Sequence, residues 1–512
     1  MWRLASMTLA VILGLGVAGN VVEPSWTPEA YTAPAAYEHV RPADPVQPTT
    51  LHADIVREAV QIDLGDETVK AMVYAPPTGT AHPAVLMLHG AGTKMSTAFA
   101  EQAEHLARSG VVVLVMAKRT TGYSTWHRDF ETMATDAAPG VEVLRQRPDV
   151  DPDKVGLFGE SEGTWVAPIA AAQDPRIAFL VLVSAPIVSP ARQATYATLT
   201  AFDGLDVPEP VNRAVAKGIG IALSLPGVLD YADFDVRPWL ARTSQPILLV
   251  FGADDPALPM IQAAELTRAA AAGPVIVRFF EGAQHGVRLG NSTAPFAPGY
   301  LDTLATWIRN QPEATGPARP GPVGGRPVQT IAANAAPPSP WYATAYAHIA
   351  VIGMGLAGYA AGPVAAAVRR IRRRGSEPAM TRERRRSLRW VRVLGLASLG
   401  GLVTYFIGLS HLALNQLTNP LLIYGVWALV WIVTAGAVMA LLSLWLGSTW
   451  RTGGEATADP GHLGPMTEVA DGPVTVAMPR LTTVESIALV GTVAGTVLFL
   501  LVVTYWGVFL GI

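Results

Sequence analysis

The last third of the chain contains four apolar runs that are each long enough to cross a membrane. They span residues 345–368, 393–414, 421–446 and 487–512, and none of them contains Asp, Glu, Lys or Arg. About 20 apolar residues in a helix cross the ~30 Å hydrocarbon core of a bilayer. The sequence therefore predicts an all-α transmembrane domain over residues 345–512, with one helix for each run.

Charge around these runs predicts their orientation. Residues 369–392 hold eleven of the 37 Lys and Arg residues and only two acids, whereas the connection NQLTNP between the second and third runs has no positive charge. Arginine-rich loops stay in the cytoplasm. The segment before residue 345 and the C-terminus are therefore expected outside the cytoplasmic membrane.

The N-terminus agrees with that orientation. Arg3 is followed by an uncharged run over residues 4–19 and then by the Pro-rich stretch EPSWTPEAYTAPAA. These are the three parts of a secretory signal, with cleavage after Ala18 or Gly19. The same run equally fits an uncleaved anchor. Residues 1–19 are thus predicted to be a signal peptide or an N-terminal anchor.

Composition divides the remainder of the chain. Residues 20–50 and 312–344 are rich in Pro and are expected to be extended linkers on either side of a globular domain over residues 51–311. Outside residues 369–392 the chain has 38 acidic and 26 basic residues, which does not suggest a nucleic-acid partner. The absence of cysteine excludes disulfides, thiolate metal sites and a cysteine nucleophile.

Strand-like and helix-like segments alternate through the globular domain. Apolar runs such as AVLMLHG, VVVLVMA, IAFLVLVSA and PILLVFG are separated by segments with helical periodicity. Nearly continuous apolar strands indicate a sheet that is covered on both faces, and helices between them indicate mostly parallel pairing. The sequence predicts an α/β fold with its ligand site at the carboxyl ends of the strands.

Ser161 lies at that edge, within VGLFGESEGTWVAP. Gly159 and Gly163 flank it, and glycines at these places allow a strand to turn sharply into a helix with the serine exposed at the apex. Asp254 and Asp255 follow PILLVFG, and His285 follows PVIVRFF. The chain order is therefore serine, acid, histidine.

These motifs resemble the α/β-hydrolase superfamily over roughly residues 55–311. The family's nucleophile turn looks like GESEG, its acid turn like GADDPALP and its base turn like EGAQHG. The chain is also similar to bacterial esterases of the dienelactone-hydrolase and serine-aminopeptidase groups, through the run AKRTTGYST and through HGAG, which is part of an LLHGAG-like run. The resemblance implies an α/β-hydrolase fold with a small helical cap at about residues 189–244. It implies neither a metal nor another cofactor.

Carried over to this chain, the resemblance makes Ser161 the nucleophile, His285 the general base and Asp255 the residue that orients the imidazole. The backbone N–H groups of Ala91 and Glu162 would form the oxyanion hole. Asp254 is the competing acid, but the turn is similar to the family pattern G-x-x-D-x-x-x-P through Asp255.

Residues close in sequence to Ser161 and Ala91 also bear on the site. His89, in HGAG, is expected to be structural, and Thr164 and Glu160 depart from the family pattern beside the nucleophile. A carboxylate at Glu160 or Glu162 could bind a cationic substrate end or could be solvated.

The sequence predicts a membrane-anchored extracytoplasmic serine hydrolase with a small-molecule or lipid or cell-envelope ester as substrate and membrane lipids as surroundings. A serine peptidase or an envelope acyltransferase could use the same triad, and a catalytically inactive binding or sensing ectodomain is the alternative from another class. The oligomeric state is not indicated.

Overall fold

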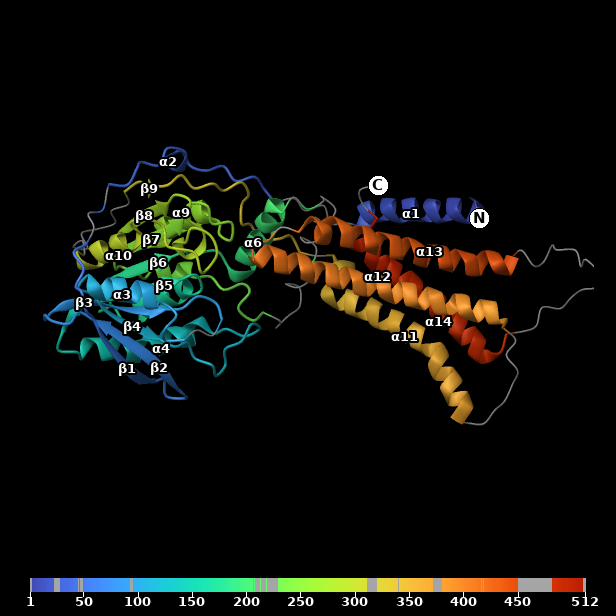
Figure 1. Ribbon diagram of the computed structural model, residues 1–512, viewed down its shortest axis with the longest axis horizontal. Coiled ribbons are helices and arrows are strands. Elements are labelled where there is room, and N and C mark those ends of the chain that lie inside the picture. Colours follow the sequence, from blue (N-terminus) through green and yellow to red (C-terminus); the bar gives the residue numbers. More distant parts are fainter. Residues whose placement is uncertain are drawn as a thin grey trace, which may run out of the picture. The chain divides into compact units, whose positions relative to one another are not determined.

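The computed structural model describes residues 2–22, 28–44, 46, 49–92, 95–205, 207, 212, 218, 229–310, 320–338, 340–371, 380–415, 417, 419–449 and 481–509. The chain divides into two compact units (Figure 1). The helical unit comprises Met1–Ser25, Leu205–Ile221 and Ser339–Ile512. The α/β unit comprises Trp26–Gly204 and Ala222–Pro338.

The described part of the α/β unit contains a nine-stranded sheet in the order β1-β2-β4-β3-β5-β6-β7-β8-β9. Pairing is antiparallel between β1 and β2 and between β2 and β4, and parallel from there to β9. The predicted mostly parallel α/β sheet is confirmed. The strands are β1 (Val56–Asp63), β2 (Thr68–Ala75), β3 (His82–Leu88), β4 (Val112–Met116), β5 (Val150–Glu160), β6 (Leu180–Val183), β7 (Ile247–Gly252), β8 (Val275–Phe280) and β9 (Val323–Gly324).

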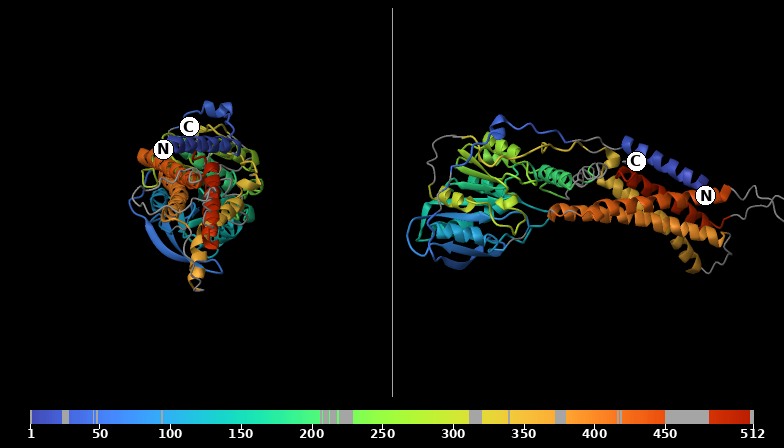
Figure 2. Two further views of the ribbon diagram at one scale, coloured as in Figure 1. Left: turned by 90° about the vertical axis from the view of Figure 1, so that its right-hand side faces the viewer. Right: turned by 45° about the horizontal axis from the view of Figure 1, so that its top comes forward.

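Helices cover both faces of this sheet (Figures 1 and 2). One face packs against α3 (Ala100–Arg108) and α10 (Tyr300–Arg309), and the other against α4 (Phe130–Arg145), α5 (Gly163–Gln173) and α9 (Met260–Ala270). Alternate residues of a strand point to opposite faces, so Leu86 enters the second of these cores while Val85 and Met87 enter the first. Burial on both faces explains why the strands are almost wholly apolar.

Parts of both Pro-rich stretches pack against the α/β unit. Tyr37, in α2 (Ala35–Glu38), is 1% exposed, and its hydroxyl donates to Glu265 Oε1 at 2.7 Å. Within the second stretch, β9 extends the sheet beside β8, and Ala30 bridges to Ile331. Pro-rich chain can pack when it supplies an aromatic ring to a core and pairs along a sheet edge. In and next to these stretches, residues 23–27, 45, 47, 48, 311–319 and 339 lie outside the described chain.

The helical unit contains five helices that are long and apolar enough to cross a membrane within the described residues. They are α1 (Trp2–Val22), α11 (Ala345–Ile371), α12 (Arg382–Asn415), a helical span over Leu421–Leu446 and α14 (Thr483–Tyr505). The span over Leu421–Leu446 consists of the π-helical turn η3 (Leu421–Val426) and most of α13 (Trp427–Thr449). The first three expected runs are therefore helical, the fourth is helical as far as Tyr505 with residues 510–512 outside the described chain, and α1 adds a fifth helix.

Two of these helices begin before their apolar runs. The first turns of α12 carry arginines, and α14 begins after Thr482, whose side chain forms a capping box with Glu485. A capping box satisfies free amides at a helix start and fixes where the helix begins. The apolar runs alone placed both helix starts too late.

Helix α1 is packed into the helical unit. Ile12 is 3% exposed and joins a cluster with residues of α12, α13 and α14. A Cβ atom at Gly16 would lie 2.9 Å from the carbonyl oxygen of Phe509, so the two backbones are close there. Residues 2–19 of the expected signal peptide or anchor thus lie in a helix that packs into this unit.

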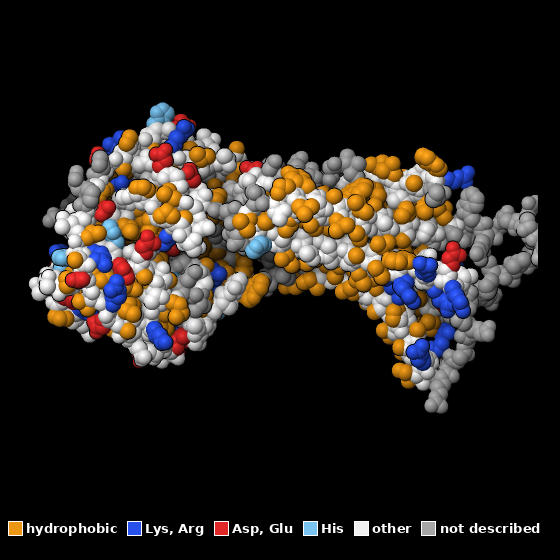
Figure 3. All heavy atoms as spheres, in the orientation of Figure 1, with side chains coloured by type: hydrophobic (Ala, Val, Ile, Leu, Met, Phe, Trp, Pro, Cys, Tyr) orange, Lys and Arg blue, Asp and Glu red, His pale blue; other side chains and the backbone are white. Residues whose placement is uncertain are grey.

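Positive charge gathers at one end of the helical unit. Figure 3 shows the Lys and Arg side chains clustered where α11 ends and α12 begins, while hydrophobic side chains cover the helices between their ends. The N-terminus of α1 lies at the same end, and α11 begins at the opposite end (Figures 1 and 2). This charge asymmetry is the one that the positive-inside rule requires of a membrane domain.

Glycines bring α11 and α14 into backbone contact. A Cβ atom at Gly358 would lie 2.6 Å from the carbonyl oxygen of Gly491, and one at Gly491 would lie 2.3 Å from the carbonyl oxygen of Gly358. Membrane helices associate largely through such close packing of small residues.

We expect Gly358→Leu to destabilise the helical unit by about 1–3 kcal/mol or more, because the added side chain must push α14 away. Gly353→Leu is the matched control on the same helix, since nothing lies within 4 Å of a Cβ atom at Gly353. Thermal unfolding of the full chain in detergent measures the difference. Equal stability of the two variants would contradict the glycine contact.

Candidate active site

Ser161 sits at the apex of a sharp turn between β5 and α5. Its φ angle is 53°, a left-handed conformation that is costly for a residue with a side chain. A Cβ atom at Gly159 would lie 2.5 Å from the carbonyl oxygen of Gly163, and one at Gly163 would lie 2.4 Å from that of Leu88. The two glycines are therefore required because backbone segments touch on both sides of the serine.

Asp255 and His285 are hydrogen-bonded to each other. They follow β7 and β8, and His285 Nδ1 lies 2.8 Å from Asp255 Oδ2. The Asp255 side chain is buried and also accepts the backbone N–H of Ala257 at 2.9 Å. Asp254, the competing acid, is exposed, and its backbone N–H donates to the carbonyl oxygen of Ala283. Of the two adjacent carboxylates, Asp255 is the one that holds the imidazole.

Close packing between the acid and base turns makes this pair possible. A Cβ atom at Gly252 would lie 2.3 Å from the carbonyl oxygen of Gln284. The N–H of Gly286 donates to Ser184 Oγ at 3.0 Å, which ties the base turn to the residue after β6. Ser184 was not identified from the sequence, because a buried serine after a strand carries no pattern of its own.

Charge around the imidazole favours its protonated form. Burial lowers the pKa of His285, but the Asp255 carboxylate, its hydrogen bond and the Glu160 carboxylate outweigh burial and raise the pKa to about 9. Glu160 is the last residue of β5, directly before Ser161. The carboxylate of Glu160, at a position where this chain departs from the family pattern, therefore raises the pKa of His285.

The base turn lies against the residue that precedes Ser161. A Cβ atom at Gly286 would lie 3.6 Å from Glu160 Oε2. Among the described residues, however, Ser161 Oγ has no hydrogen-bond partner, so it makes no hydrogen bond to His285. Catalytic hydrogen bonds are often absent or long in a site without substrate and form in the complex.

The turn after β3 packs on the same serine. A Cβ atom at Gly90 would lie 3.4 Å from Ser161 Cβ. Within the described chain, the N–H groups of Ala91 and Glu162 have no hydrogen-bond partner, whereas the N–H of Gly92 donates to the Tyr123 hydroxyl at 2.7 Å. Two free amides beside the serine are what an oxyanion hole requires.

His89 has structural contacts. Its Nε2 lies 2.8 Å from the carbonyl oxygen of Met116, its ring stacks on Phe99, and it is buried. These contacts fix the start of the turn that carries Gly90 and Ala91, in line with the structural role expected for this histidine.

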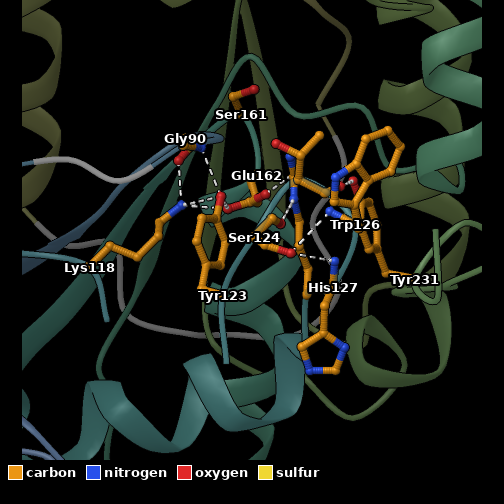
Figure 4. A network of polar contacts seen from close by, with 12 residues as sticks. Gly90, Lys118, Tyr123, Ser124, Trp126, His127, Ser161, Glu162 and Tyr231 are labelled. Atoms are coloured by element: carbon orange, nitrogen blue, oxygen red, sulfur yellow. Dashed lines mark hydrogen bonds and ion pairs between the residues drawn. The ribbon is translucent and has the colours of Figure 1, made fainter. Parts of the chain in front are cut away.

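A buried polar network surrounds Glu162, and the sequence did not reveal it (Figure 4). Glu162 is 1% exposed; Lys118 and Arg128 form ion pairs with it, and the Tyr123 hydroxyl donates to its Oε1 at 2.9 Å. The solvated or substrate-binding role considered for Glu162 is therefore wrong. Its three partners lie 34 to 44 positions away in sequence, and no spacing rule connects them to the serine.

The described part of the expected cap is attached to the acid turn. Helix α6 (Pro190–Gly204) carries Thr200, which donates to the carbonyl oxygen of Pro256, and Gln193, which donates to that of Ala257. The short helix α8 (Arg237–Leu240) follows. Most of residues 206–228, the middle of the expected cap, lie outside the described residues.

No group of three or more His, Asp or Glu residues in the described ranges is placed to hold a metal ion.

Comparison with known proteins gives matches to parts of the chain. Residues 79–215 match the family model for serine aminopeptidase, S33. The chain is 30% identical to polyketide transferase ATR5 of Stachybotrys chlorohalonatus over 162 residues, covering 30% of this chain and 54% of that protein. It is 29% identical to quorum-quenching protein AidA of Acinetobacter baumannii, covering 24% of this chain and 41% of that protein. The chain thus spans about half the length of these curated relatives.

Among solved structures, the chain is similar to a dienelactone hydrolase from Anabaena variabilis, with 20% identity and a TM-score of 0.33. That match covers 50% of this chain and 95% of the other.

The pKa of about 9 for His285 predicts that the reactivity of Ser161 rises with pH up to about 9, because only the neutral imidazole can accept the serine proton. Replacing Glu160 with glutamine removes a nearby negative charge, so we expect the apparent pKa to fall and reactivity at neutral pH to increase. The measurement is the pH profile of inactivation by an organophosphorus reagent.

Glu281→Gln is the control, since Glu281 is an exposed carboxylate just after β8. An apparent pKa that is the same in wild type and Glu160→Gln would show that Glu160 does not act on the imidazole.

Proposed function

We propose that the α/β unit of this chain, in which residues 79–215 match the serine aminopeptidase family model, is a serine hydrolase that cleaves an ester or related acyl bond through an acyl-serine intermediate. The observation that carries the proposal is the Asp255–His285 hydrogen bond in a turn packed beside the strained Ser161 elbow. A hydrolase is consistent with the matched family model.

In this mechanism the Ser161 hydroxyl attacks the substrate carbonyl carbon while His285 Nε2 accepts its proton. The Asp255 carboxylate stabilises the imidazolium, which then gives the proton to the leaving group. Water, activated by the same imidazole, releases the acid from Ser161. The amides of Ala91 and Glu162 would hold the oxyanion, each contributing about 3 kcal/mol to lowering the barrier.

We expect a fluorophosphonate probe to label the wild type and Ser161→Ala to lose that labelling together with aryl-ester hydrolysis. Asp255→Asn should lower kcat by about 10⁴-fold, because the imidazole loses its orienting carboxylate.

Asp254→Asn is the matched control, since Asp254 is the exposed neighbour of Asp255 and should be nearly neutral. Labelling of the wild type that does not depend on Ser161 would overturn the proposal and favour the inactive binding or sensing ectodomain.

We also propose that the hydrolase domain works outside the cytoplasmic membrane. The domain follows α1 and precedes α11, and it is joined to both at the ends opposite the arginine-rich end of the helical unit. If the arginines remain in the cytoplasm, the domain is on the other side. Retention of α1 as an anchor keeps this orientation.

The native chain has no cysteine, so single cysteines can map its orientation. We expect an impermeant thiol reagent to label Thr80→Cys in intact cells and Thr381→Cys only after lysis, since both positions are exposed and lie in different units. The reverse pattern would place the hydrolase domain in the cytoplasm.

Attachment to a bilayer favours a lipid or cell-envelope ester as substrate, because such substrates are concentrated where the domain is held. Full-length protein in vesicles should then act on long-chain esters faster than the released domain does, and equal rates would remove this support.

The match to the serine aminopeptidase model favours a peptidase as the second candidate. Assays of aminoacyl anilides beside aryl esters distinguish the two activities.

A further inference from the structure

Lys118 contacts the peptide group that precedes one proposed oxyanion donor. Its ammonium group donates to the carbonyl oxygen of Gly90, and this carbonyl belongs to the same peptide group as the N–H of Ala91. A cation on the carbonyl oxygen fixes the orientation of that peptide and polarises its N–H bond. The Lys118 side chain is 7% exposed, so water screens the contact weakly.

Glu162 holds this lysine. Its carboxylate forms an ion pair with Lys118, and its own backbone N–H is the second proposed oxyanion donor. One residue therefore supplies a donor through its backbone and fixes the other donor through its side chain. Figure 4 shows Lys118 extending to Glu162 and to Gly90, both beside Ser161.

Tyr123 fixes the other side of the turn. Its hydroxyl accepts the N–H of Gly92 at 2.7 Å and donates to Glu162 Oε1 at 2.9 Å. Burial raises the pKa of Tyr123, and the Glu162 carboxylate raises it further, so the phenol stays protonated and can donate. Because the Gly92 amide is occupied, Ala91 is left as the free donor of the turn.

Charge in this network favours an oxyanion. Lys118 and Arg128 both form ion pairs with the single carboxylate of Glu162, which leaves one excess positive charge among the three groups. The Arg128 guanidinium also stacks over the Tyr231 ring at 4.7 Å, and among the described residues it is Lys118, not Arg128, that donates to the carbonyl oxygen of Gly90. The two cations thus differ in one respect: Lys118 touches the oxyanion turn directly.

We propose that Lys118 is a positioning residue of the oxyanion hole, holding the Gly90–Ala91 peptide through its carbonyl oxygen while Glu162 holds Lys118. The inference rests on the proposed function, because an oxyanion hole has a role only if Ser161 forms a tetrahedral intermediate. It gives the carboxylate that follows the nucleophile a specific purpose, which is to couple the two oxyanion donors.

The test uses the full-length protein with an aryl ester and the matching thionoester, in which sulfur replaces the carbonyl oxygen. Sulfur accepts hydrogen bonds poorly, so the ratio of kcat/KM for ester over thionoester reports on the oxyanion hole. For Lys118→Met we expect kcat on the ester to fall by about 10- to 100-fold, with little change in KM, and the ratio to fall by about tenfold.

Arg128→Met is the matched control. It removes the other cation from Glu162 but leaves the contact between Lys118 and Gly90, so the ester-to-thionoester ratio should stay close to the wild-type value even if stability falls. If Lys118→Met retains the wild-type ratio, or if Arg128→Met lowers it equally, Lys118 does not position the oxyanion donors.

Lys118→Met leaves a buried carboxylate with less compensation and could fail to fold. Lys118→Met/Glu162→Gln removes that charge, keeps the backbone N–H of residue 162, and should show the same low ratio. A wild-type ratio in this double variant would overturn the proposal. Absence of Ser161-dependent hydrolysis in the wild type would instead reject the proposed function, so the two failures are distinguishable.

Discussion

The site depends on the close contact between the Ser161 elbow and the end of β3. The backbone of Gly163 approaches the carbonyl oxygen of Leu88 so closely that a methyl group could not fit between them. This contact sets the turn that begins at His89 next to the serine and leaves the amides of Ala91 and Glu162 free. The strained φ angle of Ser161 is part of the same arrangement, because the surrounding backbone contacts hold it.

Glu160 and Glu162 are only two positions apart, but their carboxylates have different charged neighbours. Glu160 faces the base turn and raises the pKa of His285, whereas Glu162 points below the elbow and is neutralised by Lys118 and Arg128. The sharp turn at Ser161 explains this division: residues two apart in a continuing strand would share a face, but here β5 ends at Glu160 and the chain turns at the positive φ of Ser161 into α5. The two acids of GESEG therefore lie in different surroundings, one beside His285 and one paired with Lys118 and Arg128.

The helical unit and the α/β unit are held together by different physical interactions. The helical unit relies on backbone contact between glycines, as at Gly358 and Gly491, and on charge confined to one end. The α/β unit relies on an apolar sheet covered on both faces. Its Pro-rich flanks belong to this second unit because Tyr37 and β9 are packed there.

Much of the architecture could be predicted from local pattern. Apolar runs indicated the long apolar helices, alternating strands and helices indicated a mostly parallel sheet, and the glycines around Ser161 indicated a sharp turn, because periodicity and backbone sterics act over a few residues. Only the tertiary structure decided that His285 bonds Asp255 while Asp254 is left in solvent, that Lys118 and Arg128 meet at Glu162, and that α1 packs as a fifth helix. These contacts join residues 30 or more positions apart, and distance in the sequence carries no information about which of several similar side chains will meet in space.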